Sequence, residues 1–140
     1  MQLHVNHSPK PGDAARFAAD IIEIAADISG AELDYGPASI AVIEDIVDGF
    51  RADGATSGEM ADSLVAFGCY VGEVLIRHVG GSWHRTPDAL HVVPLAVRLP
   101  GRCECHPVDW VFGRLELGSR GSIRELYAAA VASVTAEADG

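Results

Sequence analysis

The sequence predicts an α+β domain with three N-terminal helices, a small antiparallel sheet and a closing C-terminal helix. In the first part of the chain, apolar residues recur every three or four positions, as on one face of a helix. After Gly81 the pattern changes to closely spaced β-branched residues interrupted by turn residues, which is typical of short strands. Helical spacing returns after Ser122. Helices, then a small sheet, then another helix indicate the α+β class.

The first helix is expected over residues 14–29. Asp13 precedes it, where a carboxylate can accept hydrogen bonds from the free backbone amides of the first turn. Four large apolar residues recur at spacings of four, three and four, and we expect them to face the core: Phe17, Ile21, Ile24 and Ile28. Residues 1–12 contain Leu3 and Val5 and end in the breaker sequence SPKPG, which indicates an N-terminal arm or a short strand.

A second helix is predicted with Pro37 in its first turn, which the fixed φ of proline suits, and it is expected to stop near residues 52–54. Its core-facing stripe is apolar: Ile40, Ile43, Val47 and Phe50. Three carboxylates are expected on the exposed side: Glu44, Asp45 and Asp48.

A third helix is expected to begin at the sequence TSGE of residues 56–59, where Thr56 and Glu59 form a capping box in which hydroxyl and carboxylate each accept from the other's backbone amide. Its main stripe runs towards Gly80: Met60, Leu64, Phe67, Val71, Val74 and His78. More apolar residues lie off this stripe, so the helix is predicted to be central and contacted on several sides. Gly68 and Gly72, four residues apart, leave a flat patch where another element can approach closely.

Two antiparallel strands are predicted at residues 82–85 and 90–99, joined by a turn at residues 86–88. Pro94 has no amide hydrogen to donate, which indicates an edge strand or a bulge. Residues 102–107, with the sequence RCECHP, are expected to connect the second strand to the next element.

Pro107 opens a segment with two alternatives, a short helical turn or a strand over residues 110–117. In the helical alternative four apolar residues share one face: Val108, Val111, Phe112 and Leu115. The last helix begins at a second capping box, Ser122 with Glu125, and ends in a frayed tail at residues 136–140. Its inward residues are expected to be Leu126, Tyr127, Val131 and Val134.

The 140 residues suit a single domain that spans the chain. No apolar run approaches the roughly 18 residues that a membrane span needs. The N-terminal residues also do not resemble a signal peptide. We therefore expect a cytoplasmic protein with no membrane partner, whose three cysteines stay reduced.

The net charge of −10 is concentrated in the first half of the chain. Residues 1–62 carry twelve acidic and three basic residues, a net of −9, whereas residues 63–140 carry eight acidic and seven basic residues, a net of −1. Such a field repels nucleic-acid phosphates and anionic lipid and favours encounter with a basic protein. The alternative interpretation is that acidic helix faces simply keep the protein soluble.

The sequence RCECHP contains the densest group of residue types that bind metals: Cys103, Glu104, Cys105 and His106. A structural zinc site usually takes four ligands as two spaced pairs, and the chain has no second cysteine pair. One of three distant histidines would have to complete the site: His78, His84 or His91. A turn that carries two small thiols is the simpler interpretation, and we expect no metal and no cofactor.

Glu73 lies in the most apolar predicted helix and is a candidate general acid or base, with Tyr70 beside it. Arg77 follows four residues later and offers an ion pair instead, and Tyr70 can also donate a hydrogen bond to Glu73. The sequence motifs of zinc proteases, serine hydrolases and P-loop proteins are absent. We therefore expect no catalytic site, and Glu73 with Tyr70 are the candidates if the protein is an enzyme.

The run GCYVGEVL at residues 68–75, followed by GGSW at residues 80–83, resembles uncharacterised bacterial domains of unknown function, including actinobacterial proteins of this size. In these domains a G-x-Y-x-G-E-V helix leads through a glycine pair to a strand that carries Trp. The likeness spans about residues 33–130 and implies an α+β domain with no assigned activity. It includes Tyr70, Gly72, Glu73 and Trp83 in the family pattern and leaves out Cys103 and Cys105.

The leading hypothesis is a non-catalytic protein-interaction domain that binds a basic partner through its acidic helical half. Neutralisation of a basic toxin, as an immunity protein does, is one example of such a function. The alternative is a small enzyme or metal-binding domain that uses Glu73 with Tyr70, or Cys103, Cys105 and His106. A third hypothesis is a homodimer joined through the glycine patch of the third helix.

Overall fold

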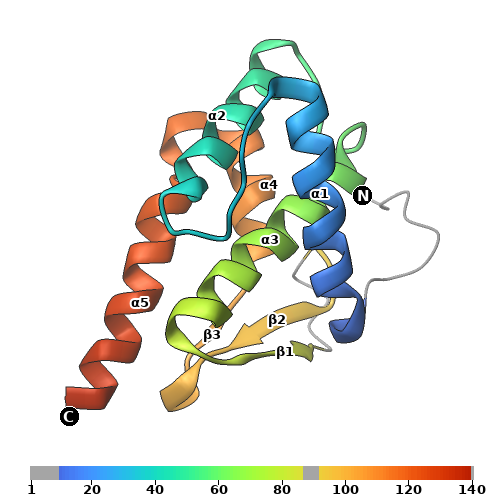
Figure 1. The fold of residues 1–140 in the computed structure, drawn as a ribbon. Coiled ribbons are helices and arrows are strands. Elements are labelled where there is room, and N and C mark those ends of the chain that lie inside the picture. Colours follow the sequence, from blue (N-terminus) through green and yellow to red (C-terminus); the bar gives the residue numbers. More distant parts are fainter. Residues whose placement is uncertain (1–9, 87–91, 140) are drawn as a thin grey trace.

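Five α-helices and a three-stranded sheet make up the described part of the chain, which confirms the α+β class (Figure 1). The computed structural model describes residues 10–86 and 92–139. The helices are α1 (Ala14–Ser29), α2 (Ser39–Ala52), α3 (Ala61–Val79), α4 (Pro107–Leu117) and α5 (Ile123–Asp139). The strands are β1 (Ser82–Arg85), β2 (Leu95–Arg98) and β3 (Glu104–Cys105). Three single turns of 3-10 helix are η1 (Pro11–Asp13), η2 (Pro100–Arg102) and η3 (Gly118–Arg120).

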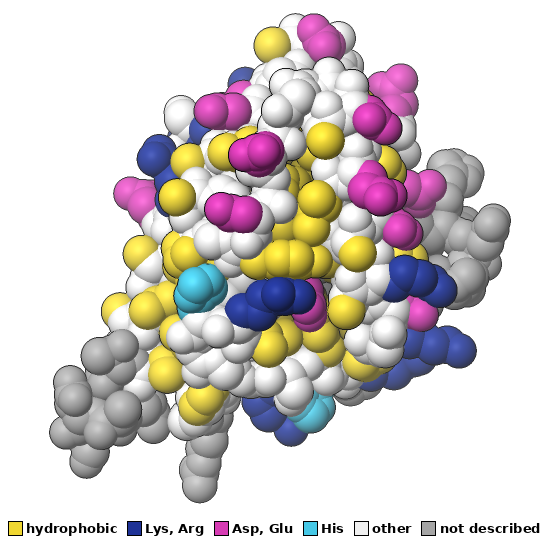
Figure 2. Space-filling model, viewed as in Figure 1, with side chains coloured by type: hydrophobic (Ala, Val, Ile, Leu, Met, Phe, Trp, Pro, Cys, Tyr) yellow, Lys and Arg dark blue, Asp and Glu magenta, His cyan; other side chains and the backbone are white. Residues whose placement is uncertain are grey.

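Helix α1 has the predicted bounds but buries a different face. Its buried residues are Ala14, Ala18, Ile21 and Ala25. Ile24 and Ile28, predicted to face the core, are 44% and 63% exposed, so the predicted stripe is wrong beyond Ile21 and the partly buried Phe17. The reason is packing, because three alanines let α1 approach α3 more closely than a row of isoleucines would. Figure 2 shows the result, with hydrophobic side chains gathered at the surface where α1 and α2 lie and carboxylates on both sides of them.

Helix α2 buries Ile40, Ile43 and Val47, as predicted, while Phe50 is half-buried. The helix begins two residues after Pro37, which lies in the preceding turn. Glu44 was expected in solvent and is instead 2% exposed, so that prediction is wrong.

Helix α3 is central, as predicted, and contacts α1, α4 and α5. Its main stripe is buried from Leu64 to Val74, whereas His78 at its end is exposed. The predicted capping box forms one turn before the helix: the Thr56 amide donates to Glu59 Oε1 at 2.9 Å, and the Glu59 amide donates to Thr56 Oγ1 at 3.2 Å.

The glycine patch of α3 is occupied from within the chain. A Cβ added at Gly68 would overlap Val108 of α4, and one added at Gly72 would overlap the ring of Trp83 in β1. The predicted close approach is therefore confirmed. Both glycines are buried in the folded chain, so the patch lies against α4 and β1 and not at the surface.

The sheet is antiparallel in the order β1–β2–β3. Strand β1 matches the prediction, whereas β2 is shorter than residues 90–99 because it starts only after Pro94. The prediction that Pro94 marks an edge strand or a bulge is wrong, since it directly precedes the central strand and its carbonyl accepts from the Thr86 amide at 3.1 Å. Part of RCECHP forms a third strand, with Cys105 opposite Val97, instead of a simple connection.

The segment opened by Pro107 is a helix, α4, and its four predicted apolar residues are buried. In α5 the inward face is only partly as predicted, since Leu126 is 40% exposed and Ile123 and Ala130 are buried instead. The helix continues to Asp139 through the segment expected to fray. Predictions for residues 1–9, 87–91 and 140 lie outside the described residues. Among the residues that the structure describes, no helix combines the length and the apolar character that a membrane span needs.

Candidate functional site

Glu73 links α3 to the sheet. Its side chain is 12% exposed, and Oε2 accepts a hydrogen bond from Trp83 Nε1 at 2.9 Å. The predicted ion pair also forms, with Arg77 Nε 3.9 Å from Glu73 Oε1. Both carboxylate oxygens are therefore engaged by groups of the same chain, which is the arrangement of a structural carboxylate.

Tyr70 does not share a site with Glu73 but holds the loop between α1 and α2. Its hydroxyl accepts from the Tyr35 amide at 2.7 Å and lies 2.7 Å from Ser39 Oγ, which donates to the Gly36 carbonyl. The Tyr70 ring is fully buried and stacks on Tyr35 with 5.1 Å between centroids. Burial raises the pKa of Tyr70, so its hydroxyl stays neutral at physiological pH.

Tyr35 has a left-handed backbone, with φ at 64°, which is uncommon for a residue other than glycine. Several contacts hold it there. The Arg77 guanidinium lies 3.7 Å from its ring centroid, and His78 Nε2 donates to its carbonyl at 3.1 Å. Tyr70, Arg77 and His78 therefore form a set of contacts that fixes the α1–α2 loop against α3, and Glu73 is joined to it only through Arg77.

Cys103 and Cys105 lie two residues apart at β3 and pack against one apolar cluster with Leu75, Val97 and Leu99. Both thiols are half-buried, and burial raises the pKa of Cys105 to about 11. The thiol of Cys105 is therefore protonated at neutral pH, and metals and electrophiles prefer a thiolate.

His106 directly precedes α4, where its carbonyl accepts from the Trp110 amide at 3.2 Å. Two of the distant histidines have other contacts: His78 with Tyr35, and His84 with Ser82 Oγ at 2.9 Å. His91 lies outside the described residues. Across residues 10–86 and 92–139, no three His, Cys, Asp or Glu side chains are grouped as metal ligands.

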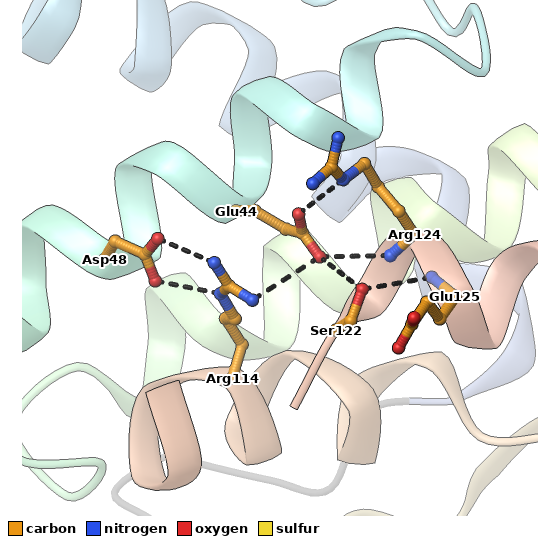
Figure 3. Close-up of polar contacts among 6 residues, drawn as sticks. All are labelled: Glu44, Asp48, Arg114, Ser122, Arg124 and Glu125. Carbon is orange, nitrogen blue, oxygen red and sulfur yellow. Dashed lines mark hydrogen bonds and ion pairs between the residues drawn. The ribbon is translucent and has the colours of Figure 1, made fainter. Parts of the chain in front are cut away.

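Sequence reasoning missed a buried ion network centred on Glu44 (Figure 3). Glu44 Oε1 accepts from Arg124 Nε at 2.8 Å, and Oε2 accepts from the Arg124 amide at 3.1 Å. Arg114 Nη1 lies 3.8 Å from the same carboxylate. Arg114 also makes a two-point pair with Asp48, at 2.8 Å and 2.7 Å, and this pair raises the pKa of Arg114.

The network joins three helices, because Glu44 and Asp48 belong to α2, Arg114 to α4 and Arg124 to α5. Glu44 also supplies a carboxylate at the N-terminus of α5, where it offsets the partial positive charge of the free amides. The sequence contained a signal for the burial of Glu44, since position 44 shares the i, i+3, i+4, i+7 face of Ile40, Ile43 and Val47. Its chemistry is structural, because both carboxylate oxygens are engaged within the chain.

A groove with apolar walls and an acidic rim lies between the end of α1 and the outer side of α2. It has a volume of about 410 Å³, and we call it the α1–α2 groove. Its lining residues are Ile28, Ser29, Ala31, Val42, Asp45, Ile46, Gly49, Phe50 and Asp53. Asp45 and Asp53 are exposed, so the groove presents apolar surface next to two carboxylates that face solvent.

A second, smaller groove of about 210 Å³ lies between α1 and the start of α3. Its lining residues are Phe17, Asp20, Ile24, Asp62, Val65 and Ala66. The part of the α1 stripe that the core does not use thus lines both grooves. No His, Cys or hydroxyl nucleophile activated by a base is among the lining residues of either groove. Surfaces of this composition suit apolar side chains and cations.

No family model matches the chain, and the curated proteins and the solved structures also gave no match. The resemblance to uncharacterised bacterial domains therefore stays a prediction. The function of this chain has to be inferred from its own geometry and charge.

Proposed function

We propose that this chain is a non-catalytic protein-interaction domain that binds a basic protein through its α1–α2 half. One observation carries the proposal: α1 has a second apolar face, with Ile24 and Ile28 at 44% and 63% exposure, beside grooves that contain carboxylates. Large apolar side chains grouped at a surface and bordered by polar residues mark sites of protein interaction.

The negative charge of the α1–α2 half supports a partner with a basic surface. Residues 1–62 have a net charge of −9, and four of their carboxylates line the two grooves: Asp20, Asp45, Asp53 and Asp62. A field of this sign speeds encounter with a cationic surface and slows encounter with nucleic acid or anionic lipid. A basic toxin bound and neutralised in the cytoplasm fits this chemistry, and there the three free cysteines stay reduced.

Self-association through this face is disfavoured. A two-fold dimer brings the same patch of both copies together, so each Asp45 and Asp53 would meet the carboxylates of the other copy. Like charges facing each other across an interface oppose binding. The face therefore suits a partner of opposite charge better than a second copy.

The proposal can be tested by photo-crosslinking in the cells from which the gene comes. A photoreactive phenylalanine analogue is placed at Ile28, in the α1–α2 groove, and at Leu117 in α4 as a control of similar exposure, 63% against 50%. We expect Ile28 to capture one basic protein that Leu117 does not capture, and we expect about 0.5 M salt to abolish the adduct because salt screens the carboxylates.

Two outcomes would overturn the proposal. One is an Ile28 adduct pattern identical to that of Leu117. The other is a captured protein that is acidic or whose capture does not respond to salt.

A further inference from the structure

Gly49 lines the α1–α2 groove in the interior of α2, although nothing in the described part of the chain requires a glycine there. A Cβ added at Gly49 would meet no atom within 4 Å, in contrast to Gly68 and Gly72 of α3, where an added Cβ would overlap a neighbour. Gly49 is exposed, and its φ is in the ordinary helical range. Because an interior glycine destabilises a helix relative to alanine, its presence in the groove calls for another explanation.

Two carboxylates flank this glycine at equal spacing, one on α2 and one at its C-cap. Asp45 and Asp53 lie four residues before and four residues after Gly49, and all three line the groove. At a rise of 1.5 Å per residue the two carboxylates are separated by about 12 Å along the helix axis. The apolar walls are formed by Val42, Ile46 and Phe50 together with the end of α1.

We propose that the α1–α2 groove holds an amphipathic helix of the basic partner, with its backbone closest to α2 at Gly49. Apolar residues of that helix at i, i+3 or i+4 and i+7 enter the groove, and Arg or Lys residues seven or eight positions apart pair with Asp45 and Asp53. The missing side chain at Gly49 is what permits the close approach. This inference rests on the proposed function and adds the shape and the charge spacing of the partner segment.

A helix suits the groove better than the other classes of ligand. The walls are helices, and no strand edge is among the lining residues, so an added β-strand has no backbone partner there. The groove residues on α2 and at its C-cap run from Val42 to Asp53, about 16 Å at 1.5 Å per residue, which is the length of three helical turns. Phosphate-bearing ligands are repelled by the two aspartates.

The test is a display selection from a library of random 16-residue peptides, with the wild-type protein as bait. Binders are counter-selected on Gly49→Leu, in which the new side chain fills the groove and an added Cβ meets no neighbour. We expect the surviving peptides to carry apolar residues at helical spacing and Arg or Lys seven or eight positions apart, and to gain helical circular dichroism on binding.

Two alanine variants then test the role of Gly49. Gly49→Ala should weaken the selected peptides about tenfold, because a methyl group is forced into a close contact. Gly113→Ala is the matched control, since Gly113 is also an interior helix glycine with no atom within 4 Å of an added Cβ and lies in α4, outside both grooves. It should leave the dissociation constant within about twofold.

Each outcome is decisive. The inference is overturned if the selection gives no peptide that Gly49→Leu fails to bind, if the binders lack paired basic residues, or if Gly49→Ala binds as well as Gly113→Ala. Suppose that one of these peptide results is negative but the photoreactive residue at Ile28 still captures a basic protein in cells. The proposed function then stands, and only the helix-in-groove geometry fails. If Ile28 captures nothing, both fail.

Discussion

Glu44 Oε1 lies 2.8 Å from Arg124 Nε, and this contact joins the middle of α2 to the first turn of α5. The pairing is unequal in exposure, since the Glu44 side chain is 3% exposed and the Arg124 side chain 65%. Arg114, with a side chain 12% exposed, supplies the second, more buried cation. A buried carboxylate held in this way is strongly destabilising when its partners are removed.

Replacement of Glu44 should therefore destabilise the fold. Glu44→Ala leaves the Arg114 guanidinium with Asp48 alone and the α5 amide of Arg124 without its acceptor, and we expect a loss of about 3–5 kcal/mol in the free energy of unfolding. Urea denaturation measures it. Asp45→Ala, at the neighbouring exposed position of α2, is the control and should change stability by less than about 0.5 kcal/mol. Equal effects of the two substitutions would show that the network does not stabilise the fold.

Three glycine-to-alanine substitutions should change the free energy of unfolding in different directions, one lowering it and two raising it. Gly72→Ala places a methyl group inside the Trp83 ring, and we expect destabilisation of about 1–3 kcal/mol from overpacking. Gly49→Ala and Gly113→Ala meet open space and should each stabilise the protein by up to about 1 kcal/mol. Thermal denaturation of the three variants gives the comparison. A stabilised Gly72→Ala would mean that α3 and β1 are not in close contact.

Glu73 and Trp83 should be energetically coupled. The hydrogen bond from Trp83 Nε1 to Glu73 is charge-assisted and part-buried, so a double-mutant cycle with Glu73→Ala and Trp83→Phe should give a coupling of about 1–3 kcal/mol. The cycle is measured by urea denaturation. A cycle between Glu116→Ala, on the exposed side of α4, and Trp83→Phe should give none. If the effects of Glu73→Ala and Trp83→Phe on the free energy of unfolding are additive, Glu73 does not stabilise the fold through Trp83.

Alkaline pH should destabilise the fold partly through Cys69. Burial, with a smaller contribution from the charge of Glu73, raises the pKa of Cys69 from 9.0 to about 12. The unfolded chain therefore ionises first, so stability is full below pH 9 and falls as the pH rises towards 12, by at most about 1.4 kcal/mol per pH unit for one group.

The Cys69→Ala variant tests this origin of the pH dependence. Its free energy of unfolding should fall less steeply between pH 9 and 11 than that of the wild type. Val71→Ala is the control, because it removes buried atoms from the same helix without removing a titrating group, and it should keep the wild-type slope. Parallel slopes for wild type and Cys69→Ala would show that this thiol does not contribute.

The order and type of most elements followed from local signals, with β3 and the choice of helix for α4 as the exceptions. The spacing of apolar residues predicted α1 at its observed bounds. The Ser122–Glu125 pair lies at the start of α5 and the Thr56–Glu59 pair lies one turn before α3, each with a hydroxyl that accepts from the later backbone amide. These signals act within about one helical turn, so neighbouring residues specify them without help from the rest of the fold. The same holds for the flat glycine patch, whose need for a close neighbour is visible before the neighbour is known.

What depends on segments distant in sequence could not be predicted from spacing alone. The helical period allowed two adjacent faces of α1 to be buried, and the fit against α3 selected the alanine face, which left Ile24 and Ile28 for the grooves. From its neighbours in sequence, Glu44 is predicted to be an exposed acid. Only the fold places Arg114 and Arg124, which lie 70 and 80 residues later in the chain, in contact with it. Likewise β3 exists only because Val97 lies opposite Cys105.

By itself the sequence determined the fold class, the approximate positions of four of the five helices, the apolar character of the core and the acidic bias of the first half, because each of these is a sum of local preferences and composition. The tertiary structure alone decided which apolar face stayed in solvent, which carboxylate was buried and which glycine was left in open space. Those outcomes are set by side chains that meet across helices, where shape and charge must match over long sequence separations. The candidate binding groove arises from these outcomes, since it is formed by the apolar surface of α1 that the core left unused.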